Sequence, residues 1–220
     1  MTGDIAHICN RGVKKHVIFI DDKDRIRFIL NLYRLNNKSG YLRITNQRNP
    51  FENLPEQNKL VEVLKWSLMP NHYHLLLYEK KDGGIVEFVK RLGNAYTKYI
   101  NIKNSTSGYV FQNSAKIILI TKNPHYLYIP FYIDLNPLDL ISGWKSGKMK
   151  PDKAINFLKK YKWSSYRDYF GKESEFLPIL NRKLFYRLFD TNHKSYQREA
   201  LDLIKKDDLL DFAEHVNLAG

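Results

Sequence analysis

The chain has 220 residues, of which 43% are hydrophobic, enough to bury a core in one domain or in a domain with an appendage. Its 36 basic and 23 acidic residues give a formal net charge of +13. A folded chain this basic favours a polyanionic partner, nucleic acid first among them, although solubility alone could account for the charge. The single cysteine, Cys9, excludes a disulfide framework and a cysteine-rich zinc cluster.

Two absences bear on localisation. No apolar run approaches the ~18 residues that a membrane-spanning helix needs. The first residues lack the succession of basic, apolar and small residues that is typical of a signal peptide. We therefore expect a cytoplasmic protein without a membrane partner, and we expect Cys9, in a predicted strand, to be a buried structural thiol.

The first third of the chain predicts a strand, a helix and a hairpin. Residues 6–10 are short and apolar and favour a strand, and the apolar spacing of 21–35 predicts a helix whose two leading aspartates suit its N-terminal end. The polar stretch 36–58 indicates a loop or an insertion. Strands at 60–68 and 72–78 then flank a Met-Pro-Asn turn.

The following segments complete a known pattern. Residues 85–102 have helical apolar spacing, 116–121 favour a strand, and Asn123-Pro124 suits the start of a helix that should end near Asn136-Pro137. The resulting order, β-α-β-β-α-β-α, predicts an α+β fold, a ferredoxin-like split βαβ sandwich with an antiparallel sheet and helices on its faces.

The remainder predicts a helical extension. We divide the chain into a domain at 1–171 and a C-terminal helical extension at 172–220. The lysine-rich stretch 145–162 could line a DNA path or be a solvated loop, and both alternatives stay open. The last helix should be acidic, so we expect DNA to bind elsewhere.

A His-x-His pair is the sharpest local feature. In a strand, His72 and His74 point to the same face, whereas Tyr73 points to the other. Two imidazoles on one face can bind one divalent ion. Such a pair is more often structural, so it needs context.

A tyrosine and an asparagine one helical turn apart form the second feature. Tyr132 and Asn136 have i, i+4 spacing and should share a helical face. A tyrosine hydroxyl, with a free pKa of ~10, is a poor nucleophile unless a nearby cation favours the phenolate. Without further context, Tyr132 is better explained as one packed tyrosine among fifteen.

Six segments in register resemble one family, the single-tyrosine HUH transposases of the insertion-sequence 200 type, and within it the REP-associated tyrosine transposases. The resemblance covers about residues 7–171. The segments read NRGVKKHVIFIDDKDRIRF, SLMPNHYHLLL, GGIVEFVKRLGNAYTKYIN, SGYVFQ, YIDLNP and WSSYRDYFG.

The resemblance implies an activity and a site. It implies Mg2+ or Mn2+ bound by His72, His74 and Asn136, with Tyr132 as the nucleophile that cuts and rejoins single-stranded DNA next to a hairpin through a 5′-phosphotyrosine. Tyr128 is a distant second choice as nucleophile. The branch also favours a monomer over a dimer. We expect basic and aromatic residues to hold the DNA: Arg11, Lys14, Lys15, Lys90, Arg91, Tyr96 and Lys116.

This chain departs from the family pattern at three places. An Asn-Ser-Ala-Lys run at 113–116 replaces the usual Gly-Arg-Phe-Lys, so one expected phosphate contact is missing while Lys116 remains. Asp134 brings an acid near the site, although on a different helical face. Pro130 should kink the helix or start a new one.

Three other functions remain open. A hairpin-binding protein without catalysis would bind DNA but not cut it. A replication or plasmid-transfer nickase could use the same site, and a metal-dependent RNase would need no tyrosine.

Overall fold

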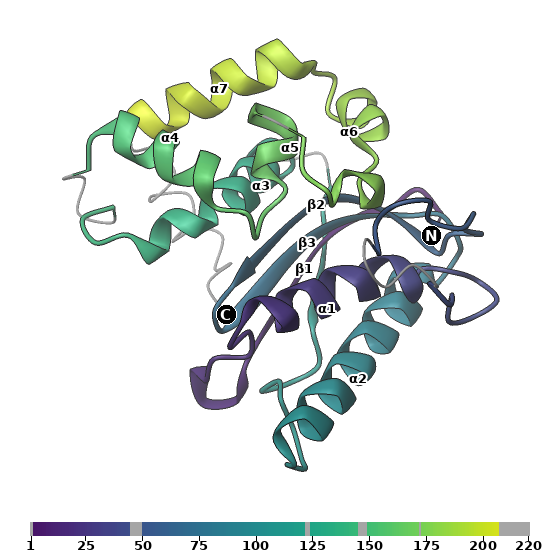
Figure 1. The fold of residues 1–220 in the computed structure, drawn as a ribbon. Helices are drawn as coiled ribbons and strands as arrows, with labels where there is room; N and C mark the ends of the chain where they lie inside the picture. The colour runs from purple at the N-terminus through teal and green to yellow at the C-terminus, as the bar shows by residue number, and fades with distance from the viewer. Residues whose placement is uncertain (1, 45–49, 122–123, 145–148, 172, 207–220) are drawn as a thin grey trace.

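A computed structural model describes residues 2–44, 50–121, 124–144, 149–171 and 173–206 of the protein (Figure 1). Its centre is one antiparallel sheet of four strands, in the order β2-β3-β1-β4. The strands are β1 (Ile5–Arg11), β2 (Val61–Met69), β3 (His72–Glu79) and β4 (Lys116–Leu119). The sequence of elements and this strand order confirm the predicted α+β sandwich.

Helices cover both faces of the sheet. Figure 1 shows α1 (Asp22–Arg34) and α2 (Gly84–Asn104) on one face, and the later helices on the other. The later helices are α3 (Pro124–Leu135), α4 (Pro151–Lys160), α5 (Tyr166–Phe170), α6 (Arg182–Leu188) and α7 (His193–Lys206). Short 3-10 turns are η1 (Val13–Lys15), η2 (Asn136–Leu140) and η3 (Leu177–Ile179). None of the helices in the described ranges is long and apolar enough to cross a membrane.

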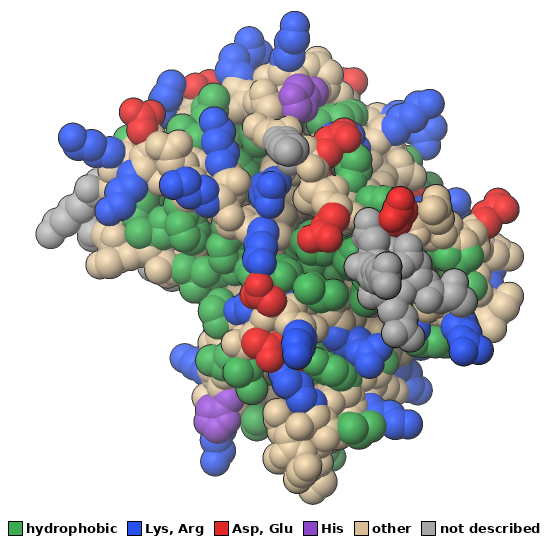
Figure 2. Space-filling model, in the orientation of Figure 1, with side chains coloured by type: hydrophobic (Ala, Val, Ile, Leu, Met, Phe, Trp, Pro, Cys, Tyr) green, Lys and Arg blue, Asp and Glu red, His purple; other side chains and the backbone are tan. Residues whose placement is uncertain are grey.

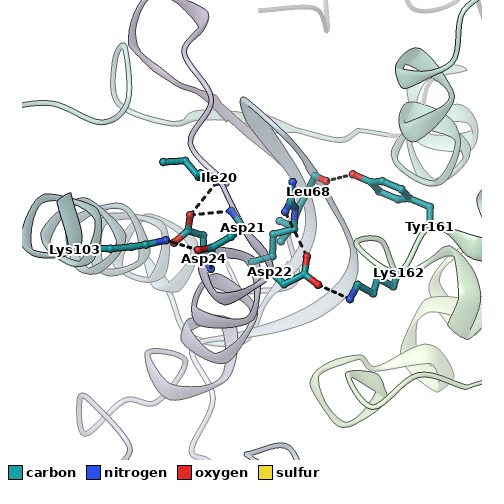
Figure 3. Close-up of polar contacts among 9 residues, drawn as sticks. Ile20, Asp21, Asp22, Asp24, Leu68, Lys103, Tyr161 and Lys162 are labelled. Carbon is teal, nitrogen blue, oxygen red and sulfur yellow. Dashed lines mark hydrogen bonds and ion pairs between the residues drawn. The ribbon is translucent and has the colours of Figure 1, made fainter.

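The start of α1 is held to both helical layers. Asp21 and Asp24 form a reciprocal capping box at its N-terminus, and Lys103 of α2 pairs with both carboxylates at 2.9 and 2.6 Å (Figure 3). On the other side, Lys162 pairs with Asp22 at 2.6 Å, and the Tyr161 hydroxyl donates to the carbonyl of Leu68 at 2.7 Å. The contact of Tyr161 with Leu68 fixes the end of β2, directly before the turn that leads to His72.

A segment after β1 fixes the turn between β2 and β3. The amides of Ile18 and Phe19 both donate to the carbonyl of Pro70, and the amide of Gly12 donates to that of Asn71. A Cβ at Gly12 would lie 2.3 Å from the carbonyl oxygen of His16, so only glycine allows this close approach. The turn that carries the His-x-His pair is therefore held from outside the hairpin.

A buried ion pair anchors α3 on the sheet. The Lys65 ammonium on β2 lies 2.7 Å from the Asp134 carboxylate on α3, and both side chains are fully buried. The Tyr196 hydroxyl of α7 donates to the same carboxylate at 2.8 Å, and the ammonium lies over the Tyr169 ring at 3.3 Å from its centroid. Burial lowers the pKa of Lys65 to about 8, which still leaves it charged at neutral pH.

Several expectations can now be compared with the structure. Asp134 lies on a different face of α3 from Tyr132, as expected. Helix α3 continues through Pro130, so of the two expected effects of this proline the start of a new helix was wrong, and a kink stays a prediction. The described parts of 36–58 contain neither helix nor strand. The lysine-rich stretch forms α4 rather than a loop from Pro151 onward.

Other expectations stay predictions. The acidic residues of the predicted last helix lie outside the described residues. The boundary at Gly171 also stays a prediction, and side chains on both sides of it pack into one apolar cluster beneath α3, including Phe170, Phe185 and Tyr196.

We predict that the Lys65–Asp134 pair is required as a unit. Asp134→Ala should lower the free energy of unfolding by about 3–5 kcal/mol, because it leaves a buried ammonium without its partner. The double variant Lys65→Met/Asp134→Leu should recover most of that loss. Urea denaturation measures both, and a loss below about 1 kcal/mol for Asp134→Ala would show that the pair does not anchor α3.

Candidate active site

The pairing of β1 with β3 gathers polar side chains on one face of the sheet. Cys9 pairs with His74 and Arg11 pairs with His72, and directly paired residues of an antiparallel sheet share a face. His7 lies on the same face because it is two residues from Cys9. Tyr73 points to the opposite face, as predicted, where its ring contacts Phe28. The face that carries the histidines is the one that α3 covers.

Helix α3 brings Tyr132 to the histidines. The Tyr132 ring centroid lies 5.3 Å from that of His74 and 6.1 Å from that of His7, and both contacts are edge-to-face. The rings of His72 and His74 are 5.1 Å apart. Residues from β1, β3 and α3, which are far apart in the sequence, thus form one cluster.

Asn136 is the first residue of η2, and its side chain completes the cluster. The residue is 7% exposed, and its side chain lies close enough to Tyr132 to lower the pKa of the phenol. Its carbonyl oxygen Oδ1 is buried and has no hydrogen-bond partner in the described part of the chain. The structure therefore brings together His72, His74, Tyr132 and Asn136, which the sequence selected separately.

Each histidine of the pair is held through Nδ1. His72 Nδ1 lies 2.7 Å from the side-chain oxygen of Asn71, and His74 Nδ1 lies 2.9 Å from Nε2 of His7. Asn71 is itself fixed, because its amide nitrogen donates to the carbonyl of Lys15. The remaining ring nitrogen, Nε2, is then the one that could bind a cation in both residues.

Burial keeps the imidazoles neutral. His7 is completely buried, and desolvation lowers its pKa to about 3. Burial also lowers the pKa of His74 far below its usual value, helped by His72, His7 and Arg11. Neutral imidazoles have the lone pairs that metal binding needs.

Tyr132 is not activated in the protein alone. Burial raises the pKa of its hydroxyl, and the nearby Asp139 raises it further. Arg11 and the Asn136 side chain lower the pKa and so act in the opposite direction. The phenol therefore stays protonated at neutral pH, so attack on a phosphate would require an additional cation.

The buried polar atoms fit a divalent ion. Three buried polar atoms lack hydrogen-bond partners among the described residues: His74 Nε2, Asn136 Oδ1 and the Ser67 hydroxyl. Ser67 pairs with His74 from the neighbouring strand β2. Unsatisfied buried polar atoms are rare in proteins and require an explanation. Two imidazoles with an amide oxygen suit a divalent ion that accepts mixed nitrogen and oxygen ligands, as Mn2+ does.

A second donor set overlaps the first and was missed from the sequence. His7, Cys9 and His74 each offer a ligand atom, and these atoms lie within 4.8 Å of one another. All three residues are buried, as expected for Cys9, and burial raises the pKa of its thiol. The His-x-Cys spacing in the first predicted strand was the available signal, but only the β1–β3 register shows that it faces His74. A thiol would favour a softer ion than Mg2+.

The expected DNA contacts divide between two faces. Arg11 is directly across from His72, and the exposed Lys116 pairs with Cys9. Lys14 and Lys15 are exposed on η1, at positive φ angles of 51° and 61° that non-glycine residues seldom adopt. Arg11 and Lys116 therefore border the candidate active site, and the carbonyl of Lys15 accepts from Asn71, the residue before His72. On the face drawn in Figure 2, basic and acidic side chains alternate, so charge does not mark that view as the DNA surface.

Helix α2 lies on the opposite face, and two of its predicted DNA contacts need correction. Tyr96 is completely buried and its hydroxyl donates to the carbonyl of Ile18, so its ring cannot stack on a base. Arg91 pairs with Glu87 and donates to the carbonyls of Leu35 and Asn37, which ties α2 to the loop after α1. Lys90 is exposed.

The competing tyrosines are remote from the histidines. Tyr99 donates its hydroxyl to Asp24 on the α1 side of the sheet. Tyr128, the second choice as nucleophile, borders a groove between α3 and α7 together with Pro130 and Leu203.

Comparison with known proteins finds similarity among solved structures. Neither a protein-family model nor a curated protein matches the chain. A solved REP-associated tyrosine transposase, bound to a REP hairpin, is similar with a TM-score of 0.46 and 15% sequence identity. The match covers 76% of this chain and 78% of that one.

We predict that the His-x-His pair carries the metal. His72→Ala and His74→Ala should each abolish cleavage of hairpin DNA while retaining hairpin binding, because the basic surface is unchanged. Cleavage assays with Mg2+ or Mn2+ and binding by fluorescence anisotropy measure the two properties.

Cys9→Ser is the matched control, because it removes a ligand only from the overlapping set of His7, Cys9 and His74. It should cut normally. Loss of cleavage in Cys9→Ser, with full cleavage in His72→Ala, would move the metal to the overlapping set.

His7 should position His74. For Nε2 of His74 to bind a cation, its Nδ1 must carry the proton and donate to His7. His7→Ala should therefore weaken Mn2+ binding by about 10–100-fold. His7→Gln, whose amide oxygen can accept the same bond, should restore most of it. Calorimetric titration gives the affinities and thermal melting reports stability; equal weakness in both variants at unchanged melting temperature would exclude this role.

Proposed function

We propose that the protein is a metal-dependent, single-tyrosine DNA strand transferase of the REP-associated tyrosine transposase type, which cuts and rejoins single-stranded DNA beside a hairpin. One observation supports this proposal most strongly: Tyr132 lies against His74, beside His72 and Asn136, although these residues come from a strand, a helix and a 3-10 turn.

The proposed reaction conserves phosphoester bonds. The Tyr132 oxygen attacks the scissile phosphorus, a P–O bond forms to tyrosine, and the bond from phosphorus to the 3′ oxygen breaks. The phenolic proton leaves to solvent and the 3′ oxygen gains one, which gives a 5′-phosphotyrosine and a 3′-hydroxyl. A 3′-hydroxyl attacking that phosphotyrosine reverses the step and rejoins strands without ATP.

The residues around Tyr132 provide the setting for this step. His72, His74 and Asn136 would hold Mg2+ or Mn2+, which when bound would neutralise phosphate charge and favour the phenolate. Asn136 would also favour the phenolate of Tyr132, because its side chain lowers the pKa of that hydroxyl. Arg11, whose charge lowers the pKa of Tyr132, would contact the phosphate.

Basic residues around the site would bind the strand. Lys14, Lys15 and Lys116 are exposed and would contact the DNA backbone, and single-stranded DNA can bend its backbone into a partly buried site. We propose a monomer, because α4 to α7 cover the outer side of α3 within one chain (Figure 1).

The variant Tyr132→Phe tests the proposed nucleophile directly. Tyr132→Phe removes one oxygen and should barely change stability, because the ring still packs against His74. It should bind hairpin DNA and metal but yield neither cleavage nor a covalent adduct. Gel analysis of the adduct and mass spectrometry of the linked peptide check this.

Tyr128→Phe is the matched control on the same helix and should form the adduct. Binding by the wild type without any adduct would favour an inactive hairpin-binding protein. Cleavage that survives Tyr132→Phe without an adduct would indicate a water nucleophile. Adducts with duplex origins but not with hairpins would favour a replication or transfer nickase.

A further inference from the structure

A groove of about 640 Å3 lies on the α2 side of the sheet, opposite the histidine cluster. Val86 and Val89 of α2 line it with Phe111 and Ile117, which form an apolar floor. Its volume is within the usual range for small-ligand pockets, roughly 300–1,000 Å3. None of its lining residues belongs to the candidate active site.

Amide side chains surround the apolar floor. Asn10, Asn94, Gln112 and Asn113 line the groove, and each carries both a hydrogen-bond donor and an acceptor. Lys90 adds an exposed positive charge at the rim. An apolar floor with amides around it matches the flat faces and polar edges of a nucleobase, and the lysine matches a phosphate.

Tyr109 adds a stacking surface. Its side chain lines the groove and is 90% exposed, which is unusual for an aromatic residue in a folded protein. An exposed aromatic ring beside a basic groove is the platform on which proteins stack unpaired bases.

Gly93 keeps the groove open. It lies in the interior of α2, where glycine destabilises a helix relative to alanine. Neither a positive φ nor a close contact requires glycine there, because a Cβ would meet no heavy atom within 4 Å outside its own helix. Gly93 lines the groove, so a longer side chain would occupy it.

A buried hydroxyl at the groove also lacks a partner. Tyr73 lines the groove, is completely buried, and lies near Asn10. Within the described ranges, its hydroxyl makes no hydrogen bond of normal distance and angle.

From these observations we infer that the groove binds an unstacked base of the single-stranded DNA on which the candidate active site acts. The inference rests on the proposed function and adds a base-binding subsite to it. The two sites are joined through strand β4 at the edge of the sheet, where Ile117 faces the groove and Lys116 pairs with Cys9 on the active-site face. Single-stranded DNA that crosses this edge of the sheet at Lys116 would contact both the groove and the candidate active site.

The first experiment locates the base. Oligonucleotides of about 20 nucleotides, longer than the ~4–16-nucleotide sites of single-strand-binding folds, carry one 5-iodouracil at successive positions and are irradiated with the full-length protein. Cross-links should map by mass spectrometry to Tyr109 or Phe111 at a narrow range of positions. Cross-links confined to residues outside the groove would overturn the inference.

The second experiment fills the groove. Gly93→Leu should weaken binding of the same unmodified oligonucleotides by about tenfold, the scale of one lost base stack, while leaving the protein at least as stable in thermal melting. Gly93→Ala is the matched control and should bind as the wild type does. Unchanged affinity in Gly93→Leu would overturn the inference.

These results are separable from those on the proposed function. If the wild type forms the Tyr132 adduct but Gly93→Leu binds normally, only the groove inference fails. If no adduct forms but cross-links map to Tyr109, the strand-transfer proposal fails and the groove remains a base-binding site.

Discussion

The ion pair between Lys65 and Asp134 determines how α3 lies on the sheet. Asp134 is two residues from both Tyr132 and Asn136, so a carboxylate held toward Lys65 turns those two side chains toward the histidines. Two charges removed from water are stabilised only in a close and fully partnered arrangement, and here Tyr196 and the Tyr169 ring complete it. A change in the rotation of α3 would break this pair and the candidate site together.

The orientation of the histidines depends on a different set of contacts. The segment after β1 binds the turn at Pro70 and Asn71, and Asn71 then holds Nδ1 of His72. His7 does the same for His74 from the neighbouring strand. Both rings would otherwise rotate about two side-chain bonds, so a metal would have to order them at the time of binding. Because the strands and the turn already fix both rings in the folded protein, metal binding does not have to orient them.

Local patterns in the sequence predicted the elements but not their neighbours. Alternation placed His72 and His74 on one face, and the i, i+4 spacing placed Asn136 beside Tyr132, since both rules act within one element. Neither rule could find His7, because its contact with His74 depends on the register of β1 against β3. Tyr96 shows the same limit: its helix was predicted, yet only the packing of α2 against Ile18 reveals that its ring is buried. A new helix does not start at Pro130, because the residues on both sides of it, Ile129 and Phe131, are buried in the packing that holds α3 as one helix.

Burial of Tyr132 has a consequence for control of the chemistry. Removal from water raises the pKa of the phenol, and Asp139 adds to this effect, so a site without a cation holds a protonated and weakly nucleophilic hydroxyl. The histidines beside it are kept neutral by the same burial, and they add no positive charge that could favour the phenolate. Arg11 contributes one charge from the strand. Under the proposed function, activation therefore requires a bound divalent ion, because the low-dielectric setting that suppresses the free phenol also strengthens its attraction to a cation.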